Sequence, residues 1–332
     1  MQKILLIQTA FIGDVVLSTG ILEKLHQFLP DARISILVRK GNETLFNGHP
    51  FLSEVLVWDK QKNKYTNLFR VLQQVRNRRF DRVINVQRFA ATGLLTVLAG
   101  AETTVGFDKN PFSFLFSEVI RHEISEGDKW LHEIDRNQTL ISSITDKKAS
   151  RPRLYPTESD YQQVAQWKEE PYLCIAPASV WFTKQFPADQ WAQFIRALPE
   201  GLNVYLLGAR GDRMLCDAIL QQSGRTCVWN LAGELGFLAS AALQQDALMN
   251  YVNDSAPMHF ASAVNAPVTA LYCSTLPSFG FGPLSDNRHI IEVQERLSCR
   301  PCGLHGKKAC PEQHFNCARM IQTSQLLATL PS

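Results

Sequence analysis

The feature of the sequence that most restricts its fold is a regular alternation of short apolar segments with longer amphipathic ones. Segments such as KILLI at 3–7 and PVTALY at 267–272 are apolar on both faces. This pattern is typical of strands buried on both faces of a parallel sheet. The intervening segments have the periodicity of helices that bury one face. Strand–helix–strand alternation therefore predicts an α/β protein with parallel sheets covered by helices.

The alternation runs along nearly the whole chain and is interrupted near its middle. Strands are expected at 4–7, 33–38, 55–58 and 82–86, with helices at 15–28, 65–78 and 130–144. Further along, strands are expected at 172–176, 203–207, 247–252 and 268–272, with helices at 187–198, 212–222 and 257–264. The stretch at 146–159 is polar and holds two prolines, which is typical of a linker. We therefore expect two doubly wound domains, at 1–153 and 154–332.

Composition excludes several classes of protein. Of the 332 residues, 45% are hydrophobic and 20% are charged, as in ordinary soluble globular proteins. The longest apolar stretch, at 93–101, is far shorter than the roughly 20 residues that a transmembrane helix needs. The N-terminal residues are typical of a strand rather than of a signal peptide. We expect a cytoplasmic protein whose eight cysteines are reduced.

Charge is spread unevenly between the two expected domains. Residues 1–153 hold 22 Lys and Arg against 16 Asp and Glu, whereas residues 154–332 hold 12 against 15. A basic domain beside an acidic one suggests an anionic partner, although a solvated basic face would give the same counts. The densest basic cluster, at 76–79, lies at an expected helix end, where the helix dipole favours cations. We therefore expect no nucleic-acid partner.

Loops after strands are the places to look for a site, because open parallel sheets bind ligands beyond the carboxyl ends of their strands. The first such loop is QTAFIGD at 8–14. Gly13 permits unusual backbone angles or a close ligand approach. Asp14 stands at a helix start, either as an N-cap or as a general base facing a cleft. The chain lacks both the three-glycine dinucleotide fingerprint and GxxxxGK, which argues against a nicotinamide enzyme and a P-loop NTPase.

The loop APASVWFTKQFP at 176–187 follows the first strand of the second expected domain. Ser179 and Thr183 supply hydroxyls and Lys184 a positive charge, just before a helix opened by Pro187. Hydroxyls, backbone amides and a lysine at a helix entrance suit a phosphate. An exposed loop lysine without a ligand is the alternative.

A third loop, NDSAPMH at 253–259, has the features of an anion-binding helix start. Asp254 or Ser255 would cap the helix, and the amides of Ser255 and Ala256 would face an anion. His259 lies in the second turn, either within reach of the same ligand or partly buried. Two anion-binding loops in one domain predict a site for a diphosphate.

The C-terminal part of the chain contains a cysteine cluster. Its members are Cys299, Cys302, Cys310 and Cys317, with His305 and His314 nearby. The number of thiols resembles a zinc site, but the spacing does not, because the second pair is not CxxC. Reduced structural thiols are the expectation, with bound zinc as the alternative.

Four segments occur in one order along the chain: KILLIQTAFIGDVVLSTGIL at 3–22, APASVWFTKQFPADQWAQFI at 176–195, NLAGE at 230–234 and VNDSAPMHFASAVNAPVTALY at 252–272. Together they resemble glycosyltransferase family 9, the ADP-heptose:lipopolysaccharide heptosyltransferases, and most of all its heptosyltransferase II branch. The resemblance implies a GT-B fold, in which two Rossmann-like domains face a central cleft. The acceptor would bind in the first domain and the nucleotide-sugar in the second.

The resemblance also implies an activity. It is inverting transfer of a heptose from ADP-heptose to the lipopolysaccharide inner core, without a catalytic metal or a cofactor. Asp14 matches the family's catalytic base, and Lys184 matches the lysine that contacts the donor diphosphate. Ser179 matches a hydroxyl position near that lysine.

The third loop matches the family's Asp-Ser/Thr-Gly stretch around the donor sugar and phosphates. Asp254, Ser255 and Ala256 occupy this stretch, and His259 matches the histidine that follows it. Ala256 stands where the family has glycine. In GARGD at 208–212 the acidic residue expected for ribose contact is displaced.

The inner core carries carboxylates and phosphates, so the basic domain at 1–153 would receive the acceptor and would also contact the inner face of the plasma membrane. Two other interpretations stay open. One is a GT-B protein that uses another nucleotide-sugar, as a transferase or an epimerase. The other is a non-catalytic carbohydrate-binding assembly protein in which Asp14 only caps a helix.

Overall fold

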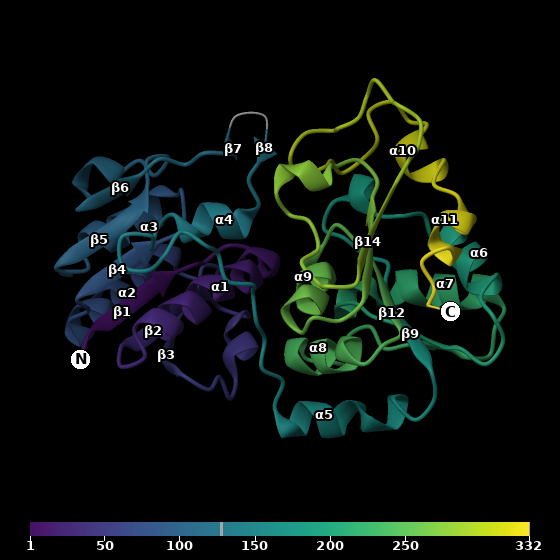
Figure 1. Cartoon of the computed structure of the whole chain (residues 1–332), viewed down its shortest axis with the longest axis horizontal. Helices are drawn as coiled ribbons and strands as arrows, with labels where there is room; N and C mark the ends of the chain where they lie inside the picture. The colour runs from purple at the N-terminus through teal and green to yellow at the C-terminus, as the bar shows by residue number, and fades with distance from the viewer. Residues whose placement is uncertain (127–128, 332) are drawn as a thin grey trace. The chain divides into compact units, whose positions relative to one another are not determined.

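The computed structural model describes residues 1–126 and 129–331, and within these residues the chain divides into two compact units (Figure 1). The first unit is Met1–Tyr155 and the second is Pro156–Ser332. The division falls two residues beyond the boundary expected from the linker composition. Each unit contains, in the described residues, a parallel sheet of six strands with helices on both faces. The expected α/β class with two Rossmann-like units is confirmed.

The sheet of the first unit has the strand order β3-β2-β1-β4-β5-β6. Its strands are β1 (Lys3–Ile7), β2 (Arg33–Arg39), β3 (Leu52–Trp58), β4 (Arg82–Asn85), β5 (Thr103–Phe107) and β6 (Glu118–Ile120). The order reverses between β1 and β4, which is the switch point where such sheets bind ligands. β1 lies at the centre because its residues from Ile4 to Ile7 are fully buried and pair with strands on both sides.

The helices of the first unit connect these strands. They are η1 (Glu43–Phe46), η2 (Ser113–Leu115), α1 (Ile12–Phe28), α2 (Lys64–Arg78), α3 (Ala90–Val97) and α4 (Glu133–Gln138). α1 is buried along most of its length, and Gly20 lets it pack closely against the chain near residue 150. A Cβ at Gly20 would lie 2.5 Å from the carbonyl oxygen of Ser150.

One helix of the first unit differs from the sequence prediction. Instead of a helix at 130–144, the structure has the short antiparallel strands β7 (Ser125–Glu126) and β8 (Lys129–Trp130), then α4 and a series of turns. The predicted helix was therefore too long. The segment at 130–144 has no continuous apolar face of the kind that a long helix would bury. Within it, the side chain of Arg136 donates hydrogen bonds to Glu133 and to the carbonyl of Leu131.

The second unit repeats the topology of the first, with the strand order β11-β10-β9-β12-β13-β14. Its strands are β9 (Tyr172–Ala176), β10 (Asn203–Leu206), β11 (Val228–Asn230), β12 (Met249–Asn253), β13 (Val268–Tyr272) and β14 (Arg288–Glu292). β9 and β12 are the central pair, with Ala176 opposite Val252 at their carboxyl ends. The loops that follow these two strands therefore start at the same edge of the sheet.

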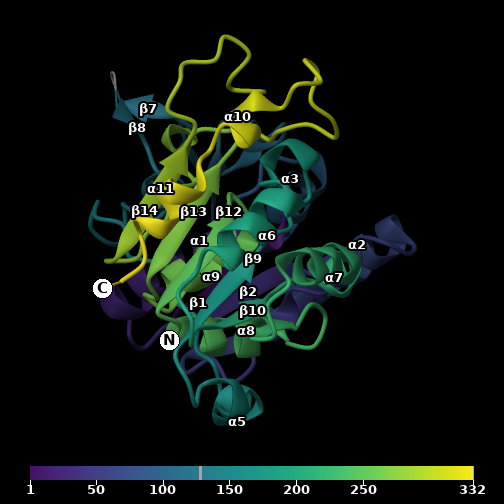
Figure 2. The same cartoon turned by 90° about the vertical axis from the view of Figure 1, so that its right-hand side faces the viewer.

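Helices cover both faces of the second sheet (Figure 2). They are α5 (Glu158–Val164), η3 (Ala165–Trp167), η4 (Phe182–Lys184), α6 (Ala188–Arg196), η5 (Arg210–Asp212), α7 (Arg213–Ser223), α8 (Phe237–Gln245), α9 (Ala256–Ala263), η6 (Pro277–Phe279), α10 (Asn316–Arg319) and α11 (Thr323–Leu327). One apolar cluster joins the sheet to α6, α7 and α11, and another joins its opposite face to α5, α8 and α9.

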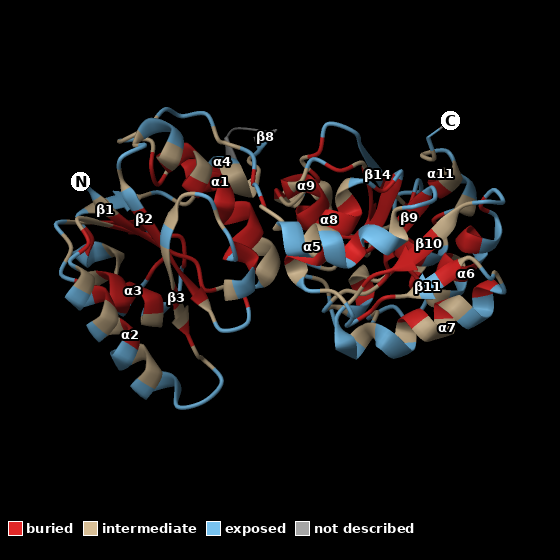
Figure 3. Cartoon of the chain, turned by 90° about the horizontal axis from the view of Figure 1, so that it is seen from below, coloured by how far each residue is buried: buried red, intermediate tan, exposed pale blue. Residues whose placement is uncertain are grey.

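The burial pattern explains why the strand sequences are so uniformly apolar. In both units the central strands are buried, whereas the exposed residues lie in the helices, in the loops and in edge strands such as β14 (Figure 3). Along β9, Leu173 and Ile175 face one cluster and Tyr172 and Cys174 the other. In the described ranges, no helix combines the length and apolar character needed to span a bilayer.

Candidate active site

Asp14 lies in the first turn of α1, immediately after the central strand β1. The N-cap of α1 is Phe11, so Asp14 is the third residue of the helix and the expectation that it is an N-cap is wrong. Gly13 is the second residue of α1 and has a helical backbone, so unusual backbone angles do not explain the glycine there. Asp14 is placed by the strand–helix turn at the switch point of the sheet.

The environment of Asp14 favours its protonated form. Burial and, to a smaller extent, the carboxylate of Glu133 on α4 raise the pKa of its carboxyl from 3.8 to about 6. The backbone amides of Asp14 and Phe11 and the guanidinium of Arg39 act in the opposite direction. A carboxylate with a pKa near the working pH is suited to accept a proton and release it again.

In the second unit, the two predicted anion-binding loops are joined by an ion pair. Lys184 is the last residue of η4, and its Nζ lies 2.7 Å from Oδ2 of Asp254, which follows β12. The two side chains are 15% and 10% exposed. The same Asp254 oxygen accepts a hydrogen bond of 2.7 Å from Oγ1 of Thr275, which follows β13. Lys184 and Asp254 thus lie at the carboxyl edge of the sheet, as the sequence predicted.

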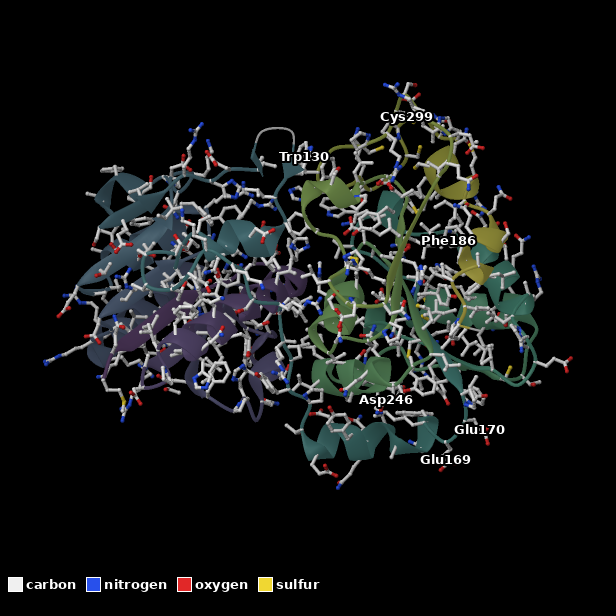
Figure 4. All side chains as sticks on the ribbon, in the orientation of Figure 1. Trp130, Glu169, Glu170, Phe186, Asp246 and Cys299 are labelled. Carbon is white, nitrogen blue, oxygen red and sulfur yellow. The ribbon has the colours of Figure 1, made fainter. Side chains whose placement is uncertain are left out.

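Asn253, the last residue of β12, also joins the two loops. Its Oδ1 accepts a hydrogen bond from the backbone N–H of Phe186 at 3.0 Å, and its Nδ2 donates to the carbonyl of Pro177 at 2.7 Å. Phe186, labelled in Figure 4, belongs to the core of the unit. Sequence reasoning did not single out Asn253, although an amide at the end of a buried strand is a recognisable signal for such a cross-link.

Ser255 is the N-cap residue of α9, and Ala256 is its first residue. The Ser255 hydroxyl donates to the carbonyl of Asn253 at 3.3 Å rather than capping the helix. Ala256 has a helical backbone, so alanine in place of the family's glycine causes no strain there. Amides in the first turn of a helix lack intrahelical acceptors and attract anions. His259, one turn further on, is buried.

Ser179 and Thr183, the two hydroxyl residues of the first loop, have different surroundings. Ser179 is partly exposed, and its carbonyl accepts a hydrogen bond from Nε2 of Gln185 at 2.6 Å. Thr183 is only 1% exposed, and its Oγ1 accepts hydrogen bonds from Oγ of Ser274 at 2.9 Å and from the backbone N–H of Lys307 at 2.8 Å. The hydroxyl of Thr183 is therefore occupied inside the protein, which revises its expected role as a ligand contact.

In the segment GARGD at 208–212, the carboxylate of Asp212 forms a hydrogen bond with the backbone of the same segment. Oδ2 of Asp212 accepts a hydrogen bond of 2.8 Å from the N–H of Ala209. Glu234, in NLAGE, forms an exposed ion pair of 2.5 Å with Arg213. Asp212 therefore serves the turn at the start of α7.

The four C-terminal cysteines line a common pocket formed by α10 and the loop before it, where Figure 4 labels Cys299. The pocket is lined by Cys299, Pro301, Cys302, Gly303, Lys307, Cys310, Pro311, Glu312, His314 and Cys317. In the described part of the chain, no group of three or more His, Cys, Asp or Glu side chains is arranged to hold a metal ion. Burial and, to a smaller extent, the neighbouring thiols raise the pKa of Cys317 to about 12.

Comparison with known proteins identifies the family. The family model described as glycosyltransferase family 9 (heptosyltransferase) matches residues 68–314. The chain belongs to glycosyltransferase family 9. The resemblance found in the sequence motifs is confirmed, and so is the expected enzyme class, a glycosyltransferase.

This family 9 glycosyltransferase is similar to curated relatives over most of its length. It is 24% identical over 319 residues to lipopolysaccharide heptosyltransferase 2 of Escherichia coli strain K12, covering 88% of each chain. It is 25% identical over 296 residues to lipopolysaccharide heptosyltransferase 3 of Escherichia coli, covering 83% of this chain and 85% of the relative.

Solved structures share the fold. The ADP-heptose lps heptosyltransferase II of E. coli superposes with a TM-score of 0.80 at 22% identity, over 99% of this chain and 97% of that one. The family 9 glycosyl transferase of Veillonella parvula superposes with a TM-score of 0.86 at 20% identity, over 99% and 96%. The expected GT-B fold is thereby confirmed.

The environment of Asp14 has a consequence for stability. Because the folded state holds the Asp14 proton up to about pH 6, stability is lost as the pH rises from about 4 through 6. Asp14→Asn should therefore be more stable than the parent protein at pH 8, by about 1–3 kcal/mol at ~1.4 kcal/mol per pKa unit. Thermal unfolding at pH 4 and pH 8 measures this.

Asp31 is exposed, so the Asp31→Asn variant is the control. Its unfolding temperature should equal that of the parent protein at both pH values. An Asp14→Asn advantage that is the same at pH 4 and pH 8 would show that burial does not perturb this carboxyl.

Proposed function

We propose that this glycosyltransferase moves a heptose, with inversion, from ADP-heptose to the lipopolysaccharide inner core. The observation that carries the proposal is the Lys184–Asp254 pair beside the first turn of α9. It places a cation and backbone amides together at the carboxyl edge of the second sheet, which suits a diphosphate. Curated relatives are lipopolysaccharide heptosyltransferases, which supports this choice of donor and acceptor.

The two units have different parts in the proposal. The second unit binds the nucleotide-sugar, with Lys184 and Ser179 near the diphosphate and Asp254, Ser255 and Ala256 around the sugar and phosphates. His259 follows in α9 and shapes the wall of that site. The first unit binds the acceptor, next to Asp14.

In the proposed reaction, an acceptor hydroxyl attacks the anomeric carbon of the donor from the face opposite the diphosphate. Asp14 accepts the hydroxyl proton while the new carbon–oxygen bond forms. The bond between the anomeric carbon and the diphosphate oxygen breaks, and its electron pair leaves with ADP. The anomeric configuration is therefore inverted, and Asp14 ends protonated and must release its proton to solvent.

Negative charge grows on the departing diphosphate as this bond breaks. Lys184 and the amides at the start of α9 stabilise that charge, and because they are preorganised they need little rearrangement in the transition state. Since these groups supply the positive charge, the proposed reaction uses no metal and no cofactor. Asp254 and Thr275 keep the Lys184 amine in the site before the donor binds.

Removal of the proton acceptor should abolish most of the activity. Asp14→Asn should lower kcat by at least about 100-fold, since general-base catalysis contributes about 10²–10⁴-fold, and should leave donor affinity unchanged. The parent enzyme should lose activity as the pH falls below about 6, where Asp14 becomes protonated. Rates of ADP release between pH 5 and 8 measure both effects. An Asp14→Asn enzyme with normal turnover would remove Asp14 from the role of base.

Removal of the cation should weaken the binding of the nucleotide. Lys184→Ala should raise the Kd for ADP at least about 10-fold, since a charged hydrogen bond contributes about 1.5–3 kcal/mol. Titration calorimetry measures this.

The control is Lys168→Ala, which breaks another lysine–aspartate pair of the same unit, with Asp246, labelled in Figure 4. It should bind ADP normally. An unchanged ADP affinity in Lys184→Ala would refute the leaving-group role. UDP, titrated in parallel, tests the alternative of another nucleotide-sugar, because tighter binding of UDP than of ADP would favour it.

We further propose that the first unit meets its anionic acceptor at the inner face of the plasma membrane. The start of α2 supports this, since Tyr65 and Phe69 are 79% and 68% exposed and one helical turn apart. Lys64 and Arg70 are exposed beside them. Exposed aromatic and basic side chains together suit an anionic lipid surface.

Salt should therefore weaken the binding of the enzyme to membranes. Sedimentation with vesicles of anionic phospholipid should decrease as the salt concentration rises, because screening shortens the reach of the basic residues. Lys64→Glu/Arg70→Glu should show weaker sedimentation even at low salt, and the parent enzyme should not sediment with vesicles of neutral phosphatidylcholine. Sedimentation that does not depend on salt would reject the electrostatic contact.

A further inference from the structure

The geometry points to Thr183 as a positioning residue: it anchors the segment at 300–307 against η4, and this segment holds Lys184 in place for the donor diphosphate. The inference rests on the proposed function of Lys184. The sequence predicts that the Thr183 hydroxyl contacts the phosphate, whereas in the structure this hydroxyl bonds to Ser274 and Lys307.

Thr183 makes a two-way connection to the segment at 300–307. Its backbone N–H donates to the carbonyl of Lys307 at 3.1 Å, and its Oγ1 accepts from the N–H of Lys307 at 2.8 Å. Oγ of Ser274, after β13, donates to the same Oγ1 at 2.9 Å. With Thr183 only 1% exposed, water cannot easily replace these bonds.

Next to this connection, Gly306 packs on the side chain of Lys184. A Cβ at Gly306 would lie 3.0 Å from Cγ of Lys184 and 3.0 Å from Oγ1 of Thr183. Gly306 has a φ of +77°, which brings its backbone into this close approach. The methylene chain of Lys184 is therefore supported by the backbone that Thr183 fixes.

The other end of the segment is fixed to the end of β13. The N–H of Cys302 donates to the carbonyl of Ser274 at 2.9 Å. The guanidinium of Arg300 donates to the carbonyls of Tyr272 at 3.0 Å and Thr275 at 2.7 Å, and pairs with Glu292. The segment thus connects the end of β13 to η4 and is held at both ends.

Lys184 is in this way held at two points. Asp254 pairs with its amine, while Gly306 supports its methylene chain. A lysine that is ordered before the ligand arrives loses less conformational entropy on binding. Loss of the Thr183 anchor should release the support of the methylene chain and leave the ion pair as the remaining restraint.

The test compares Thr183→Val, which removes the hydroxyl at nearly constant shape, with Thr183→Ser, which keeps it. We expect Thr183→Val to raise the Kd for ADP and the KM for the donor about 10-fold, with a smaller change in kcat. Thr183→Ser should restore both values. Calorimetry and initial rates of ADP release measure them, and circular dichroism verifies that each variant is folded.

A second pair of variants tests the same contact if Thr183→Val folds poorly. Gly306→Ala places a methyl group against Lys184, whereas Gly303→Ala changes a residue of the same segment that also has a positive φ, +86°. Among the described atoms, a Cβ at Gly303 would meet nothing within 4 Å. Gly306→Ala should weaken ADP binding more than Gly303→Ala does, because only the first displaces Lys184.

A double-mutant cycle separates positioning from general destabilisation. In the Lys184→Ala background, Thr183→Val should no longer change the affinity for ADP, since it acts through Lys184. An equal loss of affinity with and without Lys184, or a normal ADP affinity in Thr183→Val, would overturn the inference.

Acylation of the Lys184 amine, followed by mass spectrometry with Lys168 as internal reference, gives a readout without nucleotide. Thr183→Val should increase the labelling of Lys184 and Thr183→Ser should not. If the parent enzyme failed to bind ADP, the proposed function would fail alone. Labelling would then still decide the role of Thr183, because unchanged labelling of Lys184 in Thr183→Val would overturn it.

Discussion

The pairing of Lys184 with Asp254 is the interaction on which the candidate site of the second unit depends. A largely buried lysine is stable only with a partner for its charge, and Asp254 is such a partner at 2.7 Å. The pair also joins the loop after β9 to the loop after β12. Both side chains lie at the carboxyl edge of the sheet and are only 15% and 10% exposed, so the Lys184 amine is held in a place that water reaches only partly. That is the environment in which a cation best stabilises a developing anion.

Other contacts in the second unit hold the Lys184–Asp254 pair in place. Asn253 joins the same two loops through its hydrogen bonds to Phe186 and Pro177. The long C-terminal loop supports the methylene chain of Lys184 through Gly306. The cysteines of that loop line a pocket of their own next to this support. A segment with almost no regular secondary structure therefore has a defined place, because its hydrogen bonds go to the ends of β13 and η4.

Asp14 in the first unit shows a different use of burial. Here burial and the nearby Glu133 carboxylate make the charged carboxyl less favourable, and the guanidinium of Arg39 offsets this only in part. The unfavourable charged form lowers the stability of the fold at neutral pH. It also makes the Asp14 carboxylate a stronger base. A helix start at the switch point of the sheet can tolerate this because α1 is otherwise packed along most of its length.

Periodicity and loop position predicted much of the fold, for physical reasons that can be traced to particular segments. Buried strands such as β1 and β9 are apolar on both faces, so they could be located without coordinates. The helix expected at 130–144 was wrong, since the chain there forms β8, α4 and turns. Asp14 was rightly placed at a helix start, but it is not the N-cap, because α1 begins three residues earlier than expected and its N-cap is Phe11.

The sequence by itself determined the α/β architecture, the two-unit division and the loops in which charged and hydroxyl residues gather, because these follow from local periodicity and composition. Only the tertiary structure decided which of those residues meet. It pairs Lys184 with Asp254, and it turns Thr183 inward onto Ser274 and Lys307. Contacts of this kind join residues about 70 to 125 positions apart. They depend on the order of strands in the sheet, which local sequence does not specify.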